Sequence, residues 1–365
     1  MTQRATFLYA NVQAYTKAIL DELIEQGVEI DLYYFDTNLN TPYLPRPSKN
    51  LTLHPISKVI LFKMISSLFK AKPDIIYVSG WQSKIYLICC LLMRCKAVKI
   101  VVGFDDQWNG TIKQYLASVL SPLRILKLFY THAWVCGPYQ YEYARKMGFR
   151  KKEIIFDLLS ANPEIINNSN HLTLKRSMNE KTIVYVGRIS PEKGINLALR
   201  AWEKSKLKDQ NWKLLFIGDH HSSPMSFQRS EQKKMGVEFY EFTTQKKLGQ
   251  LLQNATFGLL PSLSEQWGVV MHEYSLVGLP VIAADGVGAN SHFLINGFNG
   301  YTFTSGSLPS LVEAMDHILE LDKYTYSMMS ENAKLLSNRI TVKTAVANLL
   351  SILPKQKLRA TYDKF

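Results

Sequence analysis

Two carboxylates with seven residues between them, Glu265 and Glu273, flank a small loop in the C-terminal half of the chain. Gly268 lies in this loop, where it lets the backbone approach a ligand closely. Residues 269–277 have helical character, and a helix amino terminus behind a small-residue loop favours a bound anion. Because carboxylates accept hydrogen bonds from hydroxyl groups, the stretch predicts a ligand with both phosphates and hydroxyls, such as a nucleotide sugar.

Two cations follow a predicted strand near the start of the same half. Residues 182–186 form the strand, Gly187 turns the chain, and Arg188 and Lys193 come directly after it. An arginine can fork onto two phosphate oxygens, whereas a lysine acts as a point charge. Ligands of parallel α/β sheets bind outside the carboxyl ends of the strands. We therefore interpret the two cations as a site for a leaving diphosphate rather than as solvated surface charges.

The C-terminal half resembles the retaining glycosyltransferases of the GT-B fold, close to glycosyltransferase family 4. The resemblance is specific over about residues 180–335, and the N-terminal half matches mainly in the order of its elements. The residues that carry it are Gly187-Arg188, Lys193-Gly194, Glu265 and Glu273, Gly278-Leu-Pro280-Val-Ile-Ala and Asn296-Gly297-Phe-Asn299-Gly300-Tyr.

The resemblance implies a role for each matching position. Arg188 and Lys193 would hold the donor diphosphate, and Glu265 would face hydroxyls of the transferred sugar. Backbone amides of residues 266–269 would contact sugar and phosphate, and Glu273 would accept hydrogen bonds from the ribose. Residues 237–242 would line the base pocket. The implied donor-binding residues are Gly187, Arg188, Lys193, Gly218, Glu265, Gln266, Trp267, Gly268, Val269 and Glu273.

Two stretches of the first half depart from the family pattern. Residues 9–15 lack the glycine-rich loop that often follows the first strand, and Asp105-Asp106 stands where a histidine is often found. One of these aspartates would then do the acid–base or positioning work, although strand-end aspartates also serve as caps. The candidate catalytic residues are Asp105, Asp106, Arg188, Lys193 and Glu265. No metal or other cofactor is expected, since neither Asp105-Asp106 nor the pair His220-His221 has a metal-binding pattern.

The order of elements predicts how these residues are positioned, because short apolar strands alternate with helices throughout the chain. The predicted strands are 6–10, 28–35, 74–78, 98–102 and 133–136, then 182–186, 212–217, 257–260 and 281–284. The predicted helices are 14–26, 56–71, 85–93, 111–130 with a break at Pro122, one ending at 147, 195–202, 245–253, 269–277, 308–321 and 341–353.

This alternation predicts an α/β fold with two Rossmann-like, doubly wound parallel-sheet domains facing a cleft. A length of 365 residues suits two domains of roughly 150 residues each. Residues 159–181 are polar and interrupted by proline, which is typical of a linker. We expect an acceptor domain over 1–165, a nucleotide-sugar donor domain over 166–335, and a C-terminal helix over 336–365 that packs back on the first domain.

Composition and charge limit the expected partners and cellular location of the protein. The formal net charge of +13 favours anionic partners. Residues 56–72 and 111–130 mix lysines with bulky apolar residues, as interfacial helices do, so peripheral contact with an anionic membrane is expected, and nucleic acid is not. The sequence shows no signal peptide and no apolar run of about 18 residues. Four scattered cysteines suit reduced thiols, and the expected location is cytoplasmic, at the inner face of a membrane.

The hypothesis is transfer of a sugar from a nucleotide diphosphate sugar to an acceptor hydroxyl with retained anomeric configuration. The expected acceptor is a surface glycan or a lipid-linked saccharide. Two alternatives stay open: a nucleotide-sugar epimerase on the same fold, and a non-catalytic nucleotide-sugar binder. A nicotinamide-dependent dehydrogenase is not expected, because no GxGxxG motif follows a predicted strand.

Overall fold

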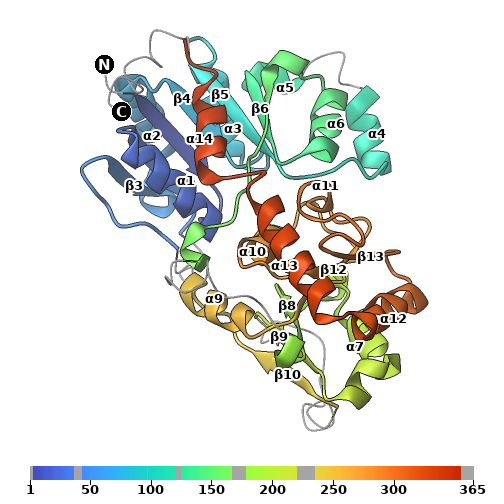
Figure 1. Cartoon of the computed structure of the whole chain (residues 1–365). Helices are drawn as coiled ribbons and strands as arrows, with labels where there is room; N and C mark the ends of the chain where they lie inside the picture. The colour runs from blue at the N-terminus through green and yellow to red at the C-terminus, as the bar shows by residue number, and fades with distance from the viewer. Residues whose placement is uncertain are drawn as a thin grey trace. The chain divides into compact units, whose positions relative to one another are not determined.

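The computed structural model describes residues 3–36, 43–96, 98–119, 125–166, 178–219 and 235–354. The chain divides into two compact units, which are Met1–Ser160 together with Ile340–Phe365, and Ala161–Arg339. Each unit is built around one sheet in which all strands are parallel, with helices against it (Figure 1). The predicted α/β class with two doubly wound sheets is therefore confirmed.

The first unit holds a seven-stranded sheet in the order β3-β2-β1-β4-β5-β6-β7. The order reverses beside β1, where Leu8 pairs with Tyr33 on one side and Val78 on the other. Central strands such as β4 are buried along their whole length, as parallel strands covered on both faces must be. The strands are β1 (Arg4–Tyr9), β2 (Glu29–Tyr34), β3 (Leu51–Pro55), β4 (Ile75–Val78), β5 (Lys99–Phe104), β6 (His132–Val135) and β7 (Ile154–Ile155).

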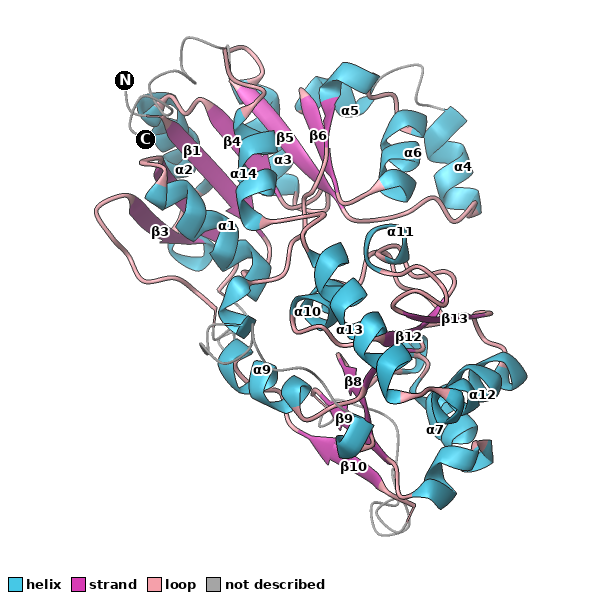
Figure 2. Ribbon diagram, viewed as in Figure 1, coloured by secondary structure: helices cyan, strands magenta, loops and turns pink. Residues whose placement is uncertain are grey.

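Helices of the first unit come from both ends of the chain. The last helix, α14, packs against the first, α1, and both lie beside the sheet (Figure 2). Asn348 of α14 donates a hydrogen bond of 2.9 Å to the Asp157 carboxylate. The helices are α1 (Ala14–Glu25), α2 (Leu61–Ala71), α3 (Lys84–Met93), α4 (Ile112–Val119), α5 (Ile125–Phe129), α6 (Pro138–Lys146) and α14 (Val342–Leu350), with short 3-10 turns η1 (Ile56–Lys58) and η3 (Lys151–Glu153).

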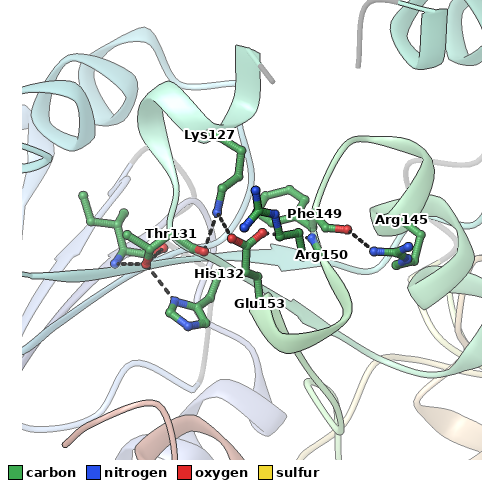
Figure 3. A network of polar contacts seen from close by, with 8 residues as sticks. Lys127, Thr131, His132, Arg145, Phe149, Arg150 and Glu153 are labelled. Atoms are coloured by element: carbon green, nitrogen blue, oxygen red, sulfur yellow. Dashed lines mark hydrogen bonds and ion pairs between the residues drawn. The ribbon is translucent and has the colours of Figure 1, made fainter. Parts of the chain in front are cut away.

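A polar network fastens the short strand β7 at the edge of this sheet (Figure 3). Lys127 of α5 lies 3.2 Å from the Glu153 carboxylate and donates to the Thr131 carbonyl at 2.8 Å. Glu153 also accepts from the Arg150 amide, and the Arg145 guanidinium donates to the Phe149 carbonyl. Part of the basic cluster at residues 145–152 therefore stabilises the fold of the first unit.

The second unit holds a six-stranded sheet in the order β10-β9-β8-β11-β12-β13. Val184 in β8 pairs with Leu215 on one side and Gly258 on the other. The strands are β8 (Thr182–Val186), β9 (Lys213–Ile217), β10 (Val237–Tyr240), β11 (Phe257–Leu260), β12 (Val281–Ala284) and β13 (Gly300–Phe303). The helices are α7 (Ile195–Lys204), α9 (Gln245–Gln253), α10 (Val270–Leu276), α11 (Asn290–Phe293), α12 (Leu308–Asp316) and α13 (Lys323–Ser337). The 3-10 segments are η4 (Pro163–Ile166), η5 (Met178–Glu180), η6 (Pro191–Lys193), η7 (Lys206–Gln210) and η8 (His317–Glu320).

Three predicted helices differ from the structure. The helix predicted over 56–71 is wrong in its first turns, because η1 ends at Lys58 and Val59 is extended before α2 begins. Adjacent β-branched residues at 59 and 60 favour such a break. The helix over 111–130 is represented by α4 and α5, and Pro122 lies outside the described residues. The helix over 308–321 ends at Asp316 and continues as η8.

Candidate functional site

The carboxyl ends of two neighbouring strands, β8 and β9, approach each other closely in the second sheet. Gly187 follows β8 and Gly218 follows β9, and the Gly187 amide donates to the Ile217 carbonyl at 3.0 Å. A Cβ atom on Gly218 would lie 1.8 Å from the Gly187 carbonyl oxygen. Only glycine fits at 218, and the turn that carries Arg188 therefore rests directly on the neighbouring strand end.

A second close approach positions Lys193. The carbonyl of Glu192 accepts hydrogen bonds from the amides of Leu263 and Ser264. Gly194 has φ +70°, and a Cβ atom there would lie 2.0 Å from the Pro261 carbonyl oxygen. These contacts press the short segment η6 against the loop that follows β11, which brings Lys193 to Glu265 although 72 residues separate them.

The Lys193 ammonium and the Glu265 carboxylate form a tight ion pair, with Nζ 2.6 Å from Oε2. Their side chains are only 16% and 13% exposed. Ser262 donates a further hydrogen bond of 3.2 Å to the same oxygen. Water is partly excluded from the pair, so the attraction is stronger than between surface charges.

Arg188 is positioned differently from Lys193. Its side chain is 74% exposed, and its guanidinium lies 3.6 Å from the Glu192 carboxylate. The backbone beneath it is fixed, because the Tyr185 hydroxyl donates to the Arg188 carbonyl at 2.7 Å. The guanidinium can therefore swing to a ligand from a rigid anchor.

The loop from Gln266 to Val269 is fixed by its tryptophan. Trp267 is buried against the rings of His292 and Phe293, and its carbonyl accepts from the Ala289 amide at 2.9 Å. Gly268 packs beside the Glu265 side chain. The helix that follows begins at Val270 and ends at Leu276, one residue inside the predicted limit at each end.

Glu273 is a buried carboxylate. Gln245, the first residue of α9, donates a hydrogen bond of 3.1 Å to its Oε1. Burial raises the pKa of Glu273 to about 7, and the bond from Gln245 lowers it in part. The neighbouring residue Tyr274 fixes α10 to the sheet, since its hydroxyl accepts from the Val186 amide at 3.0 Å. Glu273 is 8% exposed, so it is not a solvent-facing residue of the helix.

Two partners in this region could not be predicted from the sequence. The sequence places Gln245 at the start of a helix, and nothing in it links this residue to Glu273, 28 residues away. His272 is buried, and it accepts from the Ala161 amide at Nδ1 while its Nε2 lies 3.0 Å from the Ser337 carbonyl. Burial lowers the pKa of His272 to about 4, which keeps the imidazole neutral.

The aspartates Asp105 and Asp106 belong to the first unit, where they follow β5 and line a cavity of about 240 Å³. Ser79, Trp81, Gln82 and Ser83 line the same cavity. Both aspartates remain open to solvent, yet protein atoms crowd their carboxyl groups. This desolvation raises the pKa of both, and the charge of Asp106 raises that of Asp105 further. The cavity therefore combines hydroxyl, amide, aromatic and acidic groups.

Among the predicted donor residues of the second unit, the structure brings Lys193 and Glu265 into direct contact, with Arg188 five residues before Lys193 in the chain. Glu273 is instead held by Gln245. Among the residues described, no three His, Cys, Asp or Glu side chains are arranged to hold a metal ion. His220 and His221 lie outside those residues.

Residues 169–336 match the protein family described as Glycosyl transferases group 1. The chain is similar to a lipopolysaccharide 1,2-N-acetylglucosaminetransferase of Salmonella typhimurium, with 30% identity over 56% of this chain and 53% of that protein. The matched region is about half the length of the curated relatives, or less.

Solved structures define the fold of the whole chain. Sucrose-phosphate synthase from Thermosynechococcus elongatus superposes with a TM-score of 0.70 at 17% identity, covering 100% of both chains. HepE from Anabaena, solved in complex with UDP, superposes with a TM-score of 0.67 at 17% identity, also over 100% of both chains. The fold is that of the GT-B glycosyltransferases.

Proposed function

We propose that this protein is a retaining glycosyltransferase that moves a sugar from a nucleotide diphosphate sugar to an acceptor hydroxyl. The observation that carries the proposal is the Lys193–Glu265 ion pair at the strand ends of a Glycosyl transferases group 1 domain. The pair presents a cation for phosphate beside an acid for sugar hydroxyls. HepE, which has the same fold, is described in complex with UDP and glucose.

The donor diphosphate would be held by Arg188 and Lys193. The exposed Arg188 guanidinium is free to fork onto phosphate oxygens, and Lys193 would share its charge between Glu265 and the diphosphate. Both cations would stabilise the negative charge that grows on the departing nucleotide, which is electrostatic catalysis. No role is assigned to a metal ion, because these two cations supply the positive charge.

The nucleoside would be recognised by Glu273. A buried carboxyl group whose pKa is about 7 is partly ionised at neutral pH. Hydrogen bonds from ligand hydroxyls favour its charged form. Gln245 fixes the orientation of this carboxylate through its 3.1 Å hydrogen bond. The vicinal hydroxyls of a ribose match such an acceptor.

Acceptor binding would fall to the cavity of the first unit that Asp105 and Asp106 line. Trp81 gives an apolar wall there, while Ser79, Ser83 and the acids give hydrogen-bonding groups, and this mixture suits a saccharide. A surface glycan or a lipid-linked saccharide is the proposed acceptor. The Salmonella relative, which is named for lipopolysaccharide, supports this choice.

The proposed chemistry is front-face displacement. The bond from the anomeric carbon to the phosphate oxygen breaks, and the acceptor oxygen bonds to the same face of that carbon. The acceptor hydroxyl proton passes to the departing phosphate oxygen, assisted by one aspartate of the first unit. Glu265, already engaged by Lys193 and Ser262, is proposed to position the sugar and not to act as a nucleophile.

The experiment is a thermal-shift screen of UDP, GDP, ADP and their sugars, followed by an assay of acceptor-dependent nucleotide release. A nucleotide at about 100 times its dissociation constant should stabilise the protein by about 2.7 kcal/mol. Release should persist in EDTA and retain the anomeric configuration. If no nucleotide stabilises the protein, the proposal is wrong. Free epimer without acceptor would indicate an epimerase, and binding without turnover a non-catalytic binder.

A further inference from the structure

We propose that the outer sides of α2, α3 and α5, here called the α2–α3–α5 face, form a docking surface for an anionic phospholipid bilayer. The three helices are contiguous, since α3 contacts both α2 and α5. The inference rests on the proposed function for the nature of the acceptor, and it identifies the surface at which a lipid-linked acceptor would be reached.

The outer side of α3 is apolar where a surface helix is ordinarily polar. Ile88, Leu91 and Leu92 point away from the core and are 39% to 46% exposed. The opposite side of the same helix, with Cys89, Cys90 and Met93, is buried in the core. After Lys84 the helix contains no charged residue, so it is apolar on every side.

Helices α2 and α5 extend this apolar surface. Phe62 and Phe69 lie two turns apart on α2, and Phe62 is 78% exposed. Ile125 and Leu128 are exposed on α5. Exposed apolar side chains of this size on three neighbouring helices are typical of an interaction site.

Helix α4, which precedes α5 along the chain, has the same character. Ile112, Tyr115, Leu116 and Val119 follow the spacing of one helical stripe, and all four are exposed. None of the residues of α4 is buried. The stripe that would normally face a core therefore faces solvent.

The charge of the α2–α3–α5 face selects the partner. The helices α2, α3, α4 and α5 contain no Asp or Glu, whereas α1 contains three acidic residues in its second half. Exposed lysines flank the apolar side chains on α2 at Lys63 and Lys70. Lys72, Lys96 and one acid, Asp74, line a cavity of about 310 Å³ where α2 and α3 end, beside Phe69 and Met93.

A bilayer with anionic lipids matches both properties. The apolar side chains can enter the acyl boundary while the lysines meet phosphate headgroups. A second copy of the chain fits less well, because a two-fold contact would bring together two faces that carry lysines on α2 and whose helices contain no acid to pair with them. A nucleic acid would match the charge and leave the leucines and phenylalanines exposed.

The test is co-sedimentation of the full chain with vesicles of phosphatidylcholine alone or mixed with phosphatidylglycerol. The wild type should bind the mixed vesicles, and added salt should weaken this binding because it screens the lysines. The triple variant Ile88→Ser, Leu91→Ser, Leu92→Ser should lose binding by about tenfold or more. The pair Lys63→Glu, Lys70→Glu should lose about tenfold as well.

Matched controls come from the second unit. The triple variant Tyr324→Ser, Met328→Ser, Leu335→Ser removes three exposed apolar side chains from α13, and Lys204→Glu with Lys208→Glu reverses two exposed lysines. Both should bind vesicles like the wild type. All variants should remain folded, since every substituted apolar side chain is at least 39% exposed, and a melting curve of each variant checks this.

The inference is overturned if the wild type ignores anionic vesicles, if the α3 triple variant binds like the wild type, or if both triple variants lose binding equally. A dimer that the α3 triple variant dissociates, without vesicle binding, would assign the face to a second copy instead. Nucleotide stabilisation is measured separately on the same protein. Failure there would remove the proposed sugar transfer and leave vesicle binding standing.

Discussion

Lys193 Nζ lies 2.6 Å from Glu265 Oε2, and the two side chains come from segments that follow different strands, β8 and β11. The pair therefore joins two strand ends of the second sheet and also presents the charges proposed for the donor. The effect of this lysine on stability can be separated from its effect on activity by comparing variants of Lys193 with variants of Arg188, whose side chain is largely exposed.

Replacing Lys193 by Met should lower both stability and activity. Glu265 would lose its ammonium partner in a site that is partly closed to water, which should cost roughly 1–3 kcal/mol. Loss of a charge that stabilises the departing diphosphate should reduce kcat/KM on the order of a hundredfold. Denaturant unfolding and nucleotide release measure the two effects. Arg188→Gln is the control and should reduce activity with stability unchanged within about 0.5 kcal/mol. If Lys193→Met turned over like the wild type, the Lys193–Glu265 pair would have only a structural role.

The raised pKa of Glu273 predicts a pH dependence of stability. The folded state holds this proton up to about pH 7, whereas the unfolded state releases it near the ordinary value of 4.5. The free energy of unfolding should therefore fall as pH rises from about 4.5 to about 7, by up to about 3 kcal/mol from this group. Denaturant titrations of the wild type and of Glu273→Gln at several pH values measure it. The difference between them should vanish at the acid end, and a difference independent of pH would contradict the assignment.

Gln245→Ala should weaken nucleotide binding through Glu273. The variant removes the hydrogen bond that lowers the pKa of Glu273, so that pKa should rise and the carboxylate should lose its fixed orientation. Nucleotide affinity should fall about tenfold, and the loss should lessen as pH rises above about 7. Calorimetric titration with the nucleotide found in the screen measures both. Gln250→Ala, at an exposed position of the same helix, is the matched control and should bind normally.

Gly218→Ala should disturb the turn that carries Arg188. The added Cβ would lie 1.8 Å from the Gly187 carbonyl oxygen, so one of the two strand ends must move. A loss of about 2 kcal/mol in stability is expected, together with weaker nucleotide binding. Gly286→Ala introduces a Cβ into open space and should change neither quantity by more than about 0.5 kcal/mol. Equal melting temperatures for the two variants would show that the Gly187–Gly218 approach relaxes without cost.

Asp105→Asn and Asp106→Asn should separate acceptor chemistry from donor binding. Both residues lie in the first unit, so nucleotide stabilisation of the protein should be unchanged. Acceptor-dependent release should fall by about 10²–10⁴ for the aspartate that assists proton transfer, and less for the other. The stability of Asp105→Asn should equal or exceed that of the wild type near neutral pH, because the substitution removes a desolvated charge beside another acid. Weakened nucleotide binding would contradict this division of roles.

The residues proposed to bind the donor stand out in the sequence because their signals are local. Gly187, Arg188 and Lys193 follow one strand within a few residues, and Glu265 and Glu273 flank one loop. The ion pair between Lys193 and Glu265 could not be predicted, since it depends on Gly194 packing against Pro261. Gln245 was missed for the same reason, because its partner is remote in sequence.

Some strands and helices could not be predicted from the sequence because their sequence signals are weak. Strand β3 lies at the sheet edge and ends in Pro55, which is a poor strand signal. Helix α13 is rich in Tyr, Thr, Ser and Met in its first half, so its apolar stripe is weak. It is stabilised by tertiary contacts, such as the 2.7 Å hydrogen bond from Ser330 to the Gly278 carbonyl. Strand β13 begins at Gly300 and follows Asn296, Gly297 and Asn299, and glycine and asparagine are poor strand formers.

One imidazole holds the two ends of the second unit together. His272 accepts from the Ala161 amide, and its other nitrogen meets the Ser337 carbonyl, at the points where the chain begins and ends this unit. The second unit is therefore an uninterrupted segment, while the first is assembled from both extremities of the polypeptide. During translation, the second unit can fold as soon as it leaves the ribosome, because it needs no later segment of the chain. The first unit cannot complete the layer of helices that contains α1 until α14, the last described helix, has been synthesised.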